Sequence, residues 1–155
     1  KYILIASSLY SLFVVILYTI LAFIIFGSLT FSERGLLYIL NTFIFSFVAL
    51  CMALFISTLV KSKEAVSGIV NVVALSQAFL CGAFIPTMWL PESVIKIAHL
   101  LPAYWYINTN DFLAELEVLS FTNLKPIWIN MLILIVFAII FIILNNIASR
   151  KKMVS

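Results

Sequence analysis

Long apolar runs without a single charged side chain constrain this chain more than any other feature. Four such runs occur, at about 3–29, 36–60, 65–85 and 127–147. A helix needs about 20 apolar residues to cross the roughly 30 Å hydrocarbon core of a bilayer, so each run is long enough. Backbone groups in lipid have no water to bond, which makes helices the expected form of all four. The predicted fold class is therefore an all-α polytopic membrane protein with four transmembrane helices.

The composition agrees with a protein dissolved in lipid. Apolar residues make up 65% of the chain and charged residues 10%, and the mean hydropathy is +1.25. At 155 residues the chain has no room for a separate soluble catalytic domain beside four spans. We therefore expect residues 1–155 to form one transmembrane domain.

The distribution of charge predicts the orientation in the membrane. One side of the predicted spans carries Lys1, Lys61, Lys63, Arg150, Lys151 and Lys152 against Glu64 alone. The other side carries Arg34, Lys96 and Lys125 against Glu33, Glu92, Asp111, Glu115 and Glu117. Loops rich in lysine and arginine stay in the cytoplasm, so both chain ends are predicted to lie there and the protein in the cell membrane. The basic charges sit at span ends and form no stripe, which argues against a nucleic-acid partner.

The connection from 86 to 126 is predicted to form two short outer helices, at about 91–101 and 103–117. Pro91 fits the first turn of a helix, apolar residues then recur at helical spacing, and Pro102 ends or kinks this helix. Both helices are amphipathic and too short to cross a bilayer. They either dip into the outer leaflet as a re-entrant pair or lie flat on its surface. Trp89 and the aromatic run 104–106 are expected at the outer headgroup level.

The run at 65–85 carries a narrow face of small and polar side chains. Ser67, Asn71, Ala74 and Ala78 recur at helical spacing, with Ser76 and Gln77 close by. Such a face forms either a helix-packing seam, in which Asn71 bonds to a neighbour, or a wall of a polar translocation pathway. A comparable row in the second run, Ser46, Ala49, Ala53 and Ser57, favours packing.

Catalytic and metal chemistry find little support in the sequence. The single histidine, His99, lies on the polar side of an outer helix, away from any nucleophile pattern. Cys51 and Cys81 have no metal-ligand spacing, and we expect both to be buried thiols. No glycine-rich phosphate loop is present, so no catalytic residue, metal or cofactor is predicted, and any ATP must be bound by a partner subunit or another domain. The spans also lack ionisable groups that could relay protons, which weakens a secondary-transport function.

One ordered set of motifs resembles a known family. Cys-Gly-Ala-Phe-Ile-Pro at 81–86, Leu-Pro-Glu at 90–92, Leu-Pro-Ala-Tyr-Trp-Tyr at 101–106 and a last span ending in Arg-Lys-Lys at 150–152 follow one another. Together they resemble the C-terminal part of an ABC-2 type (type V) ABC transporter permease. The resemblance implies that the four spans are the third to sixth of six, so that the chain is a fragment without the first two spans and the main coupling helix. It also implies three kinds of partner: a second permease subunit, ATP-binding subunits and membrane lipids.

The resemblance further implies roles for three groups of residues. The span at 65–85 would border the translocation pathway, with Ser67, Asn71, Ala74, Gln77 and Ala78 on its wall. The outer helices would cap this pathway as a gate that includes Gly82, Pro86, Pro91, Pro102 and Tyr104. The loop with Lys61, Lys63 and Glu64 would contact the ATPase. The expected function is export of a hydrophobic or amphipathic substrate, driven by ATP that a partner hydrolyses.

Two other functions stay open at the level of sequence. The chain could be a non-transport anchor or sensor subunit of a membrane complex, which would tolerate leucine at Asn71 and Gln77. An intramembrane enzyme is the third possibility, and the lack of a catalytic set of residues argues against it.

Overall fold

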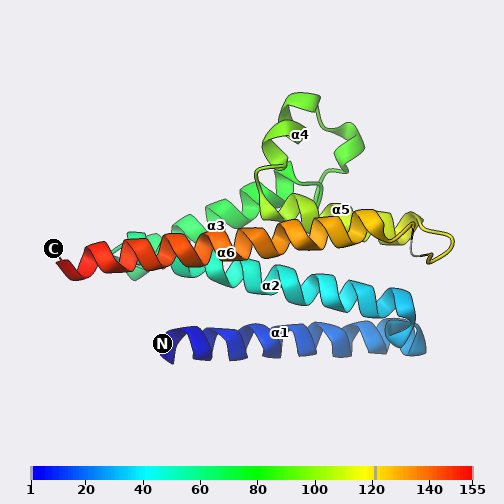
Figure 1. The fold of residues 1–155 in the computed structure, drawn as a ribbon, viewed down its shortest axis with the longest axis horizontal. Coiled ribbons are helices and arrows are strands. Elements are labelled where there is room, and N and C mark those ends of the chain that lie inside the picture. The colour runs from blue at the N-terminus through cyan, green and yellow to red at the C-terminus, as the bar shows by residue number, and fades with distance from the viewer. Residues whose placement is uncertain (1, 121, 155) are drawn as a thin grey trace.

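The computed structural model describes residues 2–120 and 122–154, and over these residues the chain is helical, with no strand (Figure 1). The elements follow in the order α1 (Tyr2–Phe26), η1 (Gly27–Phe31), α2 (Glu33–Leu59), α3 (Lys63–Leu80), η2 (Thr87–Trp89), α4 (Glu92–Ala98), α5 (Pro102–Glu115) and α6 (Lys125–Val154), where η marks a 3-10 helix. Three helical stretches, Ser8–Phe31, Glu33–Leu59 and Lys125–Arg150, are long and apolar enough to cross a membrane. The predicted all-α polytopic fold class is confirmed.

The helices α1 and α2 form a tight antiparallel hairpin. The Ser32 side chain caps α2 by accepting a hydrogen bond from the Gly35 N–H at 3.1 Å. A side chain at position 35 would place its Cβ 2.2 Å from the Thr30 carbonyl oxygen, so this turn requires glycine. Along the hairpin, the Ser11 hydroxyl donates to the Ser46 hydroxyl at 2.9 Å. Ser46 therefore serves helix packing, as its row in the second run predicted.

The helix α3 is shorter than the predicted span at 65–85. It ends at Leu80, because Gly82 adopts a positive φ of 106° that other residues rarely reach. A side chain at Gly82 would also lie 2.8 Å from Cγ2 of Thr87. Residues 81–85 are consequently turns and bends, and the 18 residues of α3 do not reach the length and hydropathy of the three spanning helices. A complete fourth crossing at 65–85 stays a prediction.

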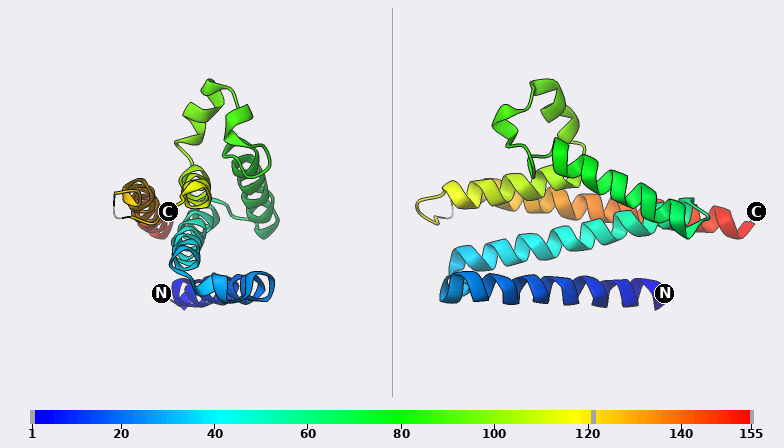
Figure 2. Two further views of the ribbon diagram at one scale, coloured as in Figure 1. Left: turned by 90° about the vertical axis from the view of Figure 1, so that its right-hand side faces the viewer. Right: turned by 180° about the vertical axis from the view of Figure 1, so that it is seen from behind.

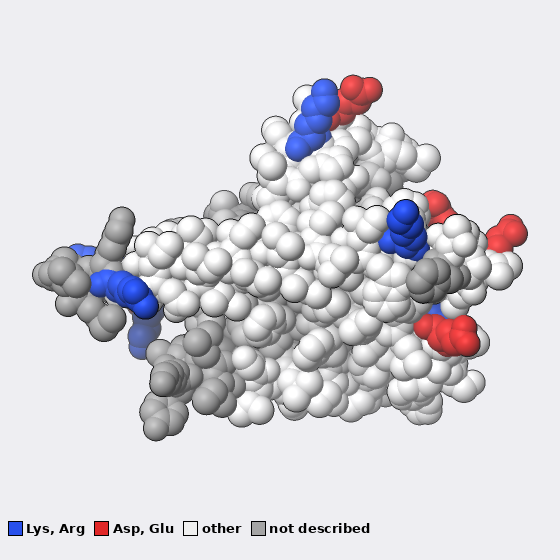
Figure 3. Space-filling view, viewed as in Figure 1, with Lys and Arg blue, Asp and Glu red and all other residues white. Residues whose placement is uncertain are grey.

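Charged side chains mark the two ends of the helix bundle. Acidic groups gather at the end where α2 begins and α5 ends, which we call the acidic end (Figure 3). The opposite end, where α2 ends and α3 begins, carries Lys61 and Lys63 and is called the basic end. The charge separation that the sequence predicted is thus present along the axis of the bundle.

The helix α5 begins inside the bundle. Trp105 and Tyr106, in its first turns, pack against Val48 of α2 and against Leu134 and Ala138, which lie near the middle of α6. Its last turn packs near the start of α6, where Leu113, Ile127 and Met131 form a buried cluster. Since α5 starts at the middle depth of α6 and runs toward the acidic end, it is re-entrant and does not lie flat on the surface (Figure 2). The expectation that Trp105 and Tyr106 mark the headgroup level is wrong, because packing against two helices holds them at mid-depth.

The segment between α3 and α5 stands out from the side of the bundle in all three ribbon views (Figures 1 and 2). It contains η2 and α4, and α4 is shorter than predicted, since the chain turns after Ala98. Its tip exposes Met88 and Trp89, and α4 carries Glu92 in its first turn and Lys96 in its last. We call residues 81–101 the lateral segment.

Candidate functional site

Amide and hydroxyl groups of α2 hold α5 in the bundle. Asn41 is fully buried, and its Nδ2 donates to the Tyr106 carbonyl at 3.0 Å and to Oδ1 of Asn110 at 2.9 Å. One turn before Asn41 on α2, the Tyr38 hydroxyl donates to the Asn110 carbonyl at 3.2 Å. Directly after Asn41, the Thr42 hydroxyl lies 3.4 Å from the Tyr106 hydroxyl. Polar groups in a bilayer interior need such partners, so this row fixes the position and register of α5 against α2.

The helix α6 and the start of α2 complete the attachment of α5. Asn130 of α6 is buried and donates through Nδ2 to Oδ1 of Asn108 at 2.9 Å. The Arg34 guanidinium donates to the Leu116 carbonyl, which follows the last turn of α5. This carbonyl is one of the groups that a helix end leaves without an intrahelical donor. The helix α5 is thus bonded along its length to both long neighbours.

Gln77 of α3 supplies a hydrogen-bond acceptor to the first turn of α5, which has no side-chain cap of its own. The residue before α5, Leu101, offers no side-chain cap, and both Pro102 and Ala103 are buried. The Ala103 N–H donates to Oε1 of Gln77 at 3.3 Å, while Nε2 of Gln77 lies 3.7 Å from the Met52 sulfur of α2. Gln77 is only 5% exposed. It is therefore a packed cap of the re-entrant helix, in contrast to its predicted place on an open pathway wall.

The rest of the predicted pathway row lies on an uncovered face of α3. Ser67, Asn71 and Ala74 are exposed, and Ala78 is half-buried near the end of the helix. Within the described part of the chain, the Asn71 amide makes no hydrogen bond. The packing alternative, with Asn71 bonded to a neighbouring helix of this chain, is thus not what the structure has.

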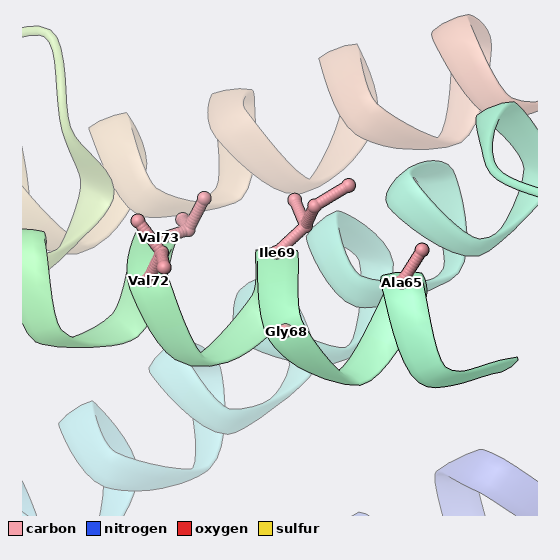
Figure 4. A pocket seen from close by; sticks show the side chains of 5 residues that line it. All are labelled: Ala65, Gly68, Ile69, Val72 and Val73. Atoms are coloured by element: carbon pink, nitrogen blue, oxygen red, sulfur yellow. The ribbon is translucent and has the colours of Figure 1, made fainter. Parts of the chain in front are cut away.

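A shallow apolar groove lies on an adjoining face of α3. Ala65, Gly68, Ile69, Val72 and Val73 line it, and its volume is about 330 Å³. The labelled side chains lie along one side of the helix, and Gly68 leaves a gap among them (Figure 4). The sequence did not predict this groove. It lies on the half of α3 nearer the basic end, which packs loosely against the rest of the chain.

The predicted gate residues fall into two places. Gly82, Pro102 and Tyr104 lie together where α3 ends and α5 begins, and the His99 and Tyr104 rings contact each other there at a tilt of 38°, with centroids 4.2 Å apart. Pro86 and Pro91 precede η2 and α4, and both are exposed on the lateral segment. Prolines at these positions start a new helical turn, which explains the punctuated course of the segment.

The predicted ATPase contact forms an exposed loop at the basic end. Lys61, Lys63 and Glu64 are all exposed, and the Ser62 hydroxyl caps α3 by accepting from the Ala65 N–H at 3.1 Å. The same hydroxyl donates to Oε2 of Glu64 at 3.0 Å. A backbone hydrogen bond at the start of the helix, followed by this side-chain bond, holds the pKa of Glu64 below its usual range. The loop therefore presents two exposed cations and an anion that Ser62 holds in place.

Catalytic chemistry gains no support from the geometry. His99 is exposed, and its Nδ1 lies 2.6 Å from the carbonyl of Ile95 on its own helix. Cys51 and Cys81 are buried free thiols, as predicted. Among residues 2–120 and 122–154 no group of three metal-ligating side chains comes together.

Comparison with known families decides the class of this bundle. The sequence model of the family described as ABC-2 type transporter matches residues 2–110. The chain belongs to the ABC-2 type transporter family. Searches of curated proteins and of solved structures each gave no match.

Family membership makes this chain a permease component of an ABC transporter and implies association with an ATP-binding subunit in a dimeric arrangement. The match covers α1 to α4 and most of α5, and it includes the α3 face, the lateral segment and the basic loop. Permease components of this class are generally not themselves catalytic. The transport function therefore has to be sought in the arrangement of helices.

The sequence did not predict the residues that hold α5 in the ABC-2 permease. They are Tyr38, Asn41, Asn108, Asn110 and Asn130. A signal for some of them was present, since Asn41 and Asn130 are amides inside apolar runs, where a polar group requires a partner. The sequence did not identify the hydrogen-bond partners of these amides, because nothing in it placed α5 at the middle depth of the bundle.

Proposed function

We propose that the chain is the membrane-spanning permease subunit of an ATP-driven exporter. Its full form would move a hydrophobic or amphipathic substrate out through the cell membrane, with ATP hydrolysed by a partner subunit. The basic end, and with it both chain ends, would lie in the cytoplasm, as expected of regions rich in lysine and arginine. The loop with Lys61, Lys63 and Glu64 would then face the ATP-binding subunit.

One observation carries this proposal. Ser67 and Asn71 are exposed on α3, which the sequence predicts to be a membrane helix, and the Asn71 amide has no partner among the described residues. An unpaired amide is costly in hydrocarbon, so this face is expected to meet water or protein. A second permease subunit facing it across a water-filled pathway would supply both.

The lateral segment supports the same arrangement. It bears Glu92 and Lys96 to the side of the bundle, where lipid would surround a lone chain (Figure 3). Charged groups avoid that environment unless protein or water covers them. In the proposed dimer, the lateral segment with Gly82, Pro86 and Pro91, and the adjoining Pro102 and Tyr104, would close the outer side of the pathway.

Cysteine labelling of the full-length transporter with its ATPase tests the proposal without knowledge of the substrate. Asn71→Cys is expected to react with a charged, membrane-impermeant thiosulfonate added from the basic side in the nucleotide-free state. Trapping with ATP and vanadate should change that rate at least several-fold. Ile139→Cys, at an exposed apolar position of α6, is the matched control and should stay unreactive because it faces lipid.

If Asn71→Cys stays as unreactive as Ile139→Cys in every nucleotide state, this face is a closed packing surface. The proposed pathway would then be wrong. A non-transport anchor or sensor function would explain such a result better.

A further inference from the structure

The lateral segment is held to the bundle at both of its ends. At its start, Cys81 packs with Ala98 and Ala103 in one buried cluster. At its other end, the Trp105 indole N–H donates to the His99 carbonyl at 3.0 Å. Because buried contacts and hydrogen bonds fix both ends on the same part of the bundle, the lateral segment is a preformed projection and not a loose loop.

Large apolar side chains are exposed on the surface of this projection. Met88 is 83% exposed and Trp89 is 74% exposed, and Phe84, Ile97 and Leu100 are exposed as well. A group of exposed apolar side chains on one projecting element marks a surface that another protein or lipid covers. The lateral segment is therefore a candidate interaction surface.

Two charges on α4 favour protein over lipid as the cover. Glu92 and Lys96 are both exposed and lie four residues apart, which places them on one face of the helix. Within the described part of the chain, neither side chain has a hydrogen-bond or ion-pair partner. The lateral segment leaves the bundle from its side (Figures 1 and 2). Charged groups at that position are costly in lipid and need protein or water around them.

The pair of charges fits a second copy of the same chain. A two-fold symmetric contact brings the same surface of two copies together, so residue i of one copy meets residue j of the other, and the reverse. When two α4 helices meet antiparallel, Glu92 of each copy lies opposite Lys96 of the other. A face with one acid and one base is thus complementary to itself, whereas two like charges on this face would repel their own copies.

We propose that the lateral segments of two copies of this chain bind each other through antiparallel α4 helices, with Glu92 of each copy paired to Lys96 of the other. The exposed side chains of Met88 and Trp89 flank these ion pairs and shield them from lipid. This inference rests on the proposed function, because it makes the second permease subunit of the exporter a copy of this chain. The outer closure of the pathway then consists of one lateral segment from each copy.

Charge variants of the full-length transporter with its ATPase test the pairing. Glu92→Lys gives α4 two cations and Lys96→Glu gives it two anions, so each variant alone places like charges opposite each other. Each is expected to lower cross-linking between copies at least about threefold, because two attractive pairs become repulsive. Co-expression of both variants under different tags places cations opposite anions, and cross-linking of mixed pairs should return to within about twofold of the wild type. The two charges within each copy still repel, so this recovery reports pairing between copies.

Ser93→Cys supplies the cross-link in each of these proteins. Ser93 is exposed on α4 between the two charged residues, and a short bifunctional thiosulfonate is expected to join two copies there in native membranes. The protein without Ser93→Cys gives the background, since Cys51 and Cys81 are buried. Glu117→Lys, a charge reversal at an exposed position of the acidic end, is the matched control and should leave the cross-linked fraction unchanged.

The outcomes separate this contact from the proposed function. Mixed variants that cross-link no better than either variant alone would overturn the ion pairs and leave the transporter standing. Differently tagged wild-type copies that do not co-purify would overturn the contact between copies, since the second permease subunit would then be another chain. Absence of any ATPase that depends on this permease would overturn the proposed function, and recovery of cross-linking in the mixed variants would still establish the α4 contact.

Discussion

Replacing Gln77 with leucine tests the link between α3 and the re-entrant helix. The substitution keeps the approximate size of the side chain and removes the acceptor for the Ala103 N–H. This N–H lies in the first turn of α5, where no earlier turn can accept it and where Leu101 provides no cap. A buried donor left without a partner costs about 1–3 kcal/mol. We expect the substitution to lower the free energy of opening the contact between α3 and α5 by the same amount.

The reactivity of Cys81 reports this opening directly. Its thiol is fully buried and packs against Ala103, so it reacts only when the seam separates. Because about 1.4 kcal/mol corresponds to a factor of ten, alkylation of Cys81 by a membrane-permeant maleimide should accelerate about 5- to 150-fold. The rate is measured by mass spectrometry of the peptide that contains Cys81, in the full-length protein in lipid nanodiscs.

Ser76→Leu is the matched control for this substitution. Ser76 neighbours Gln77 on α3, is exposed and makes no hydrogen bond to the rest of the described chain. It should leave the alkylation rate of Cys81 within about twofold of the wild type, as is usual for exposed positions. Equal rates in wild type, Gln77→Leu and Ser76→Leu would refute the cap, and a large effect of Ser76→Leu would mean that α3 itself has been disturbed.

Three further experiments test the packing of the bundle. Gly35→Ala should destabilise the protein by about 1–3 kcal/mol, because its Cβ meets the backbone of η1, while Gly68→Ala, with open space around it, should not lower the melting temperature. Asn41→Leu should cost about 1–3 kcal/mol by removing two bonds to α5, seen as a lower melting temperature in detergent; an unchanged value would contradict the anchoring role. Ser11→Cys with Ser46→Cys should form a disulfide under mild oxidant, since the two hydroxyl oxygens lie 2.9 Å apart, and two free thiols afterwards would contradict the packing of α1 on α2.

The helices themselves could be predicted from sequence for a simple physical reason. Lipid excludes charge, so the stretches between charged residues give the long helices directly. Proline and glycine then mark the breaks, and Pro91 and Pro102 do precede or open α4 and α5. The apolar run predicts an end of α3 five residues beyond Leu80, because an apolar sequence hides a turn and only Gly82, near the end of the run, points to it.

The depth of α5 and the role of Gln77 could not be predicted in the same way. Aromatic side chains suit both a membrane interface and a packed interior, so Trp105 and Tyr106 did not distinguish the two. An amide on a membrane helix needs a partner, but helical spacing does not say which one. Gln77 and Asn71 therefore looked alike in sequence, yet Gln77 caps α5 while Asn71 stays exposed.

The measurement that tests the central claim most directly is purification of the full-length protein from native membranes. It would be tagged, solubilised in mild detergent and examined for what accompanies it and for ATPase activity. We expect an ATP-binding subunit, separate or fused, at near-equal stoichiometry and ATPase activity that depends on the permease. Recovery of the intact protein without any ATP-binding subunit, when its full-length gene encodes none, would contradict the assignment as an ATP-driven exporter.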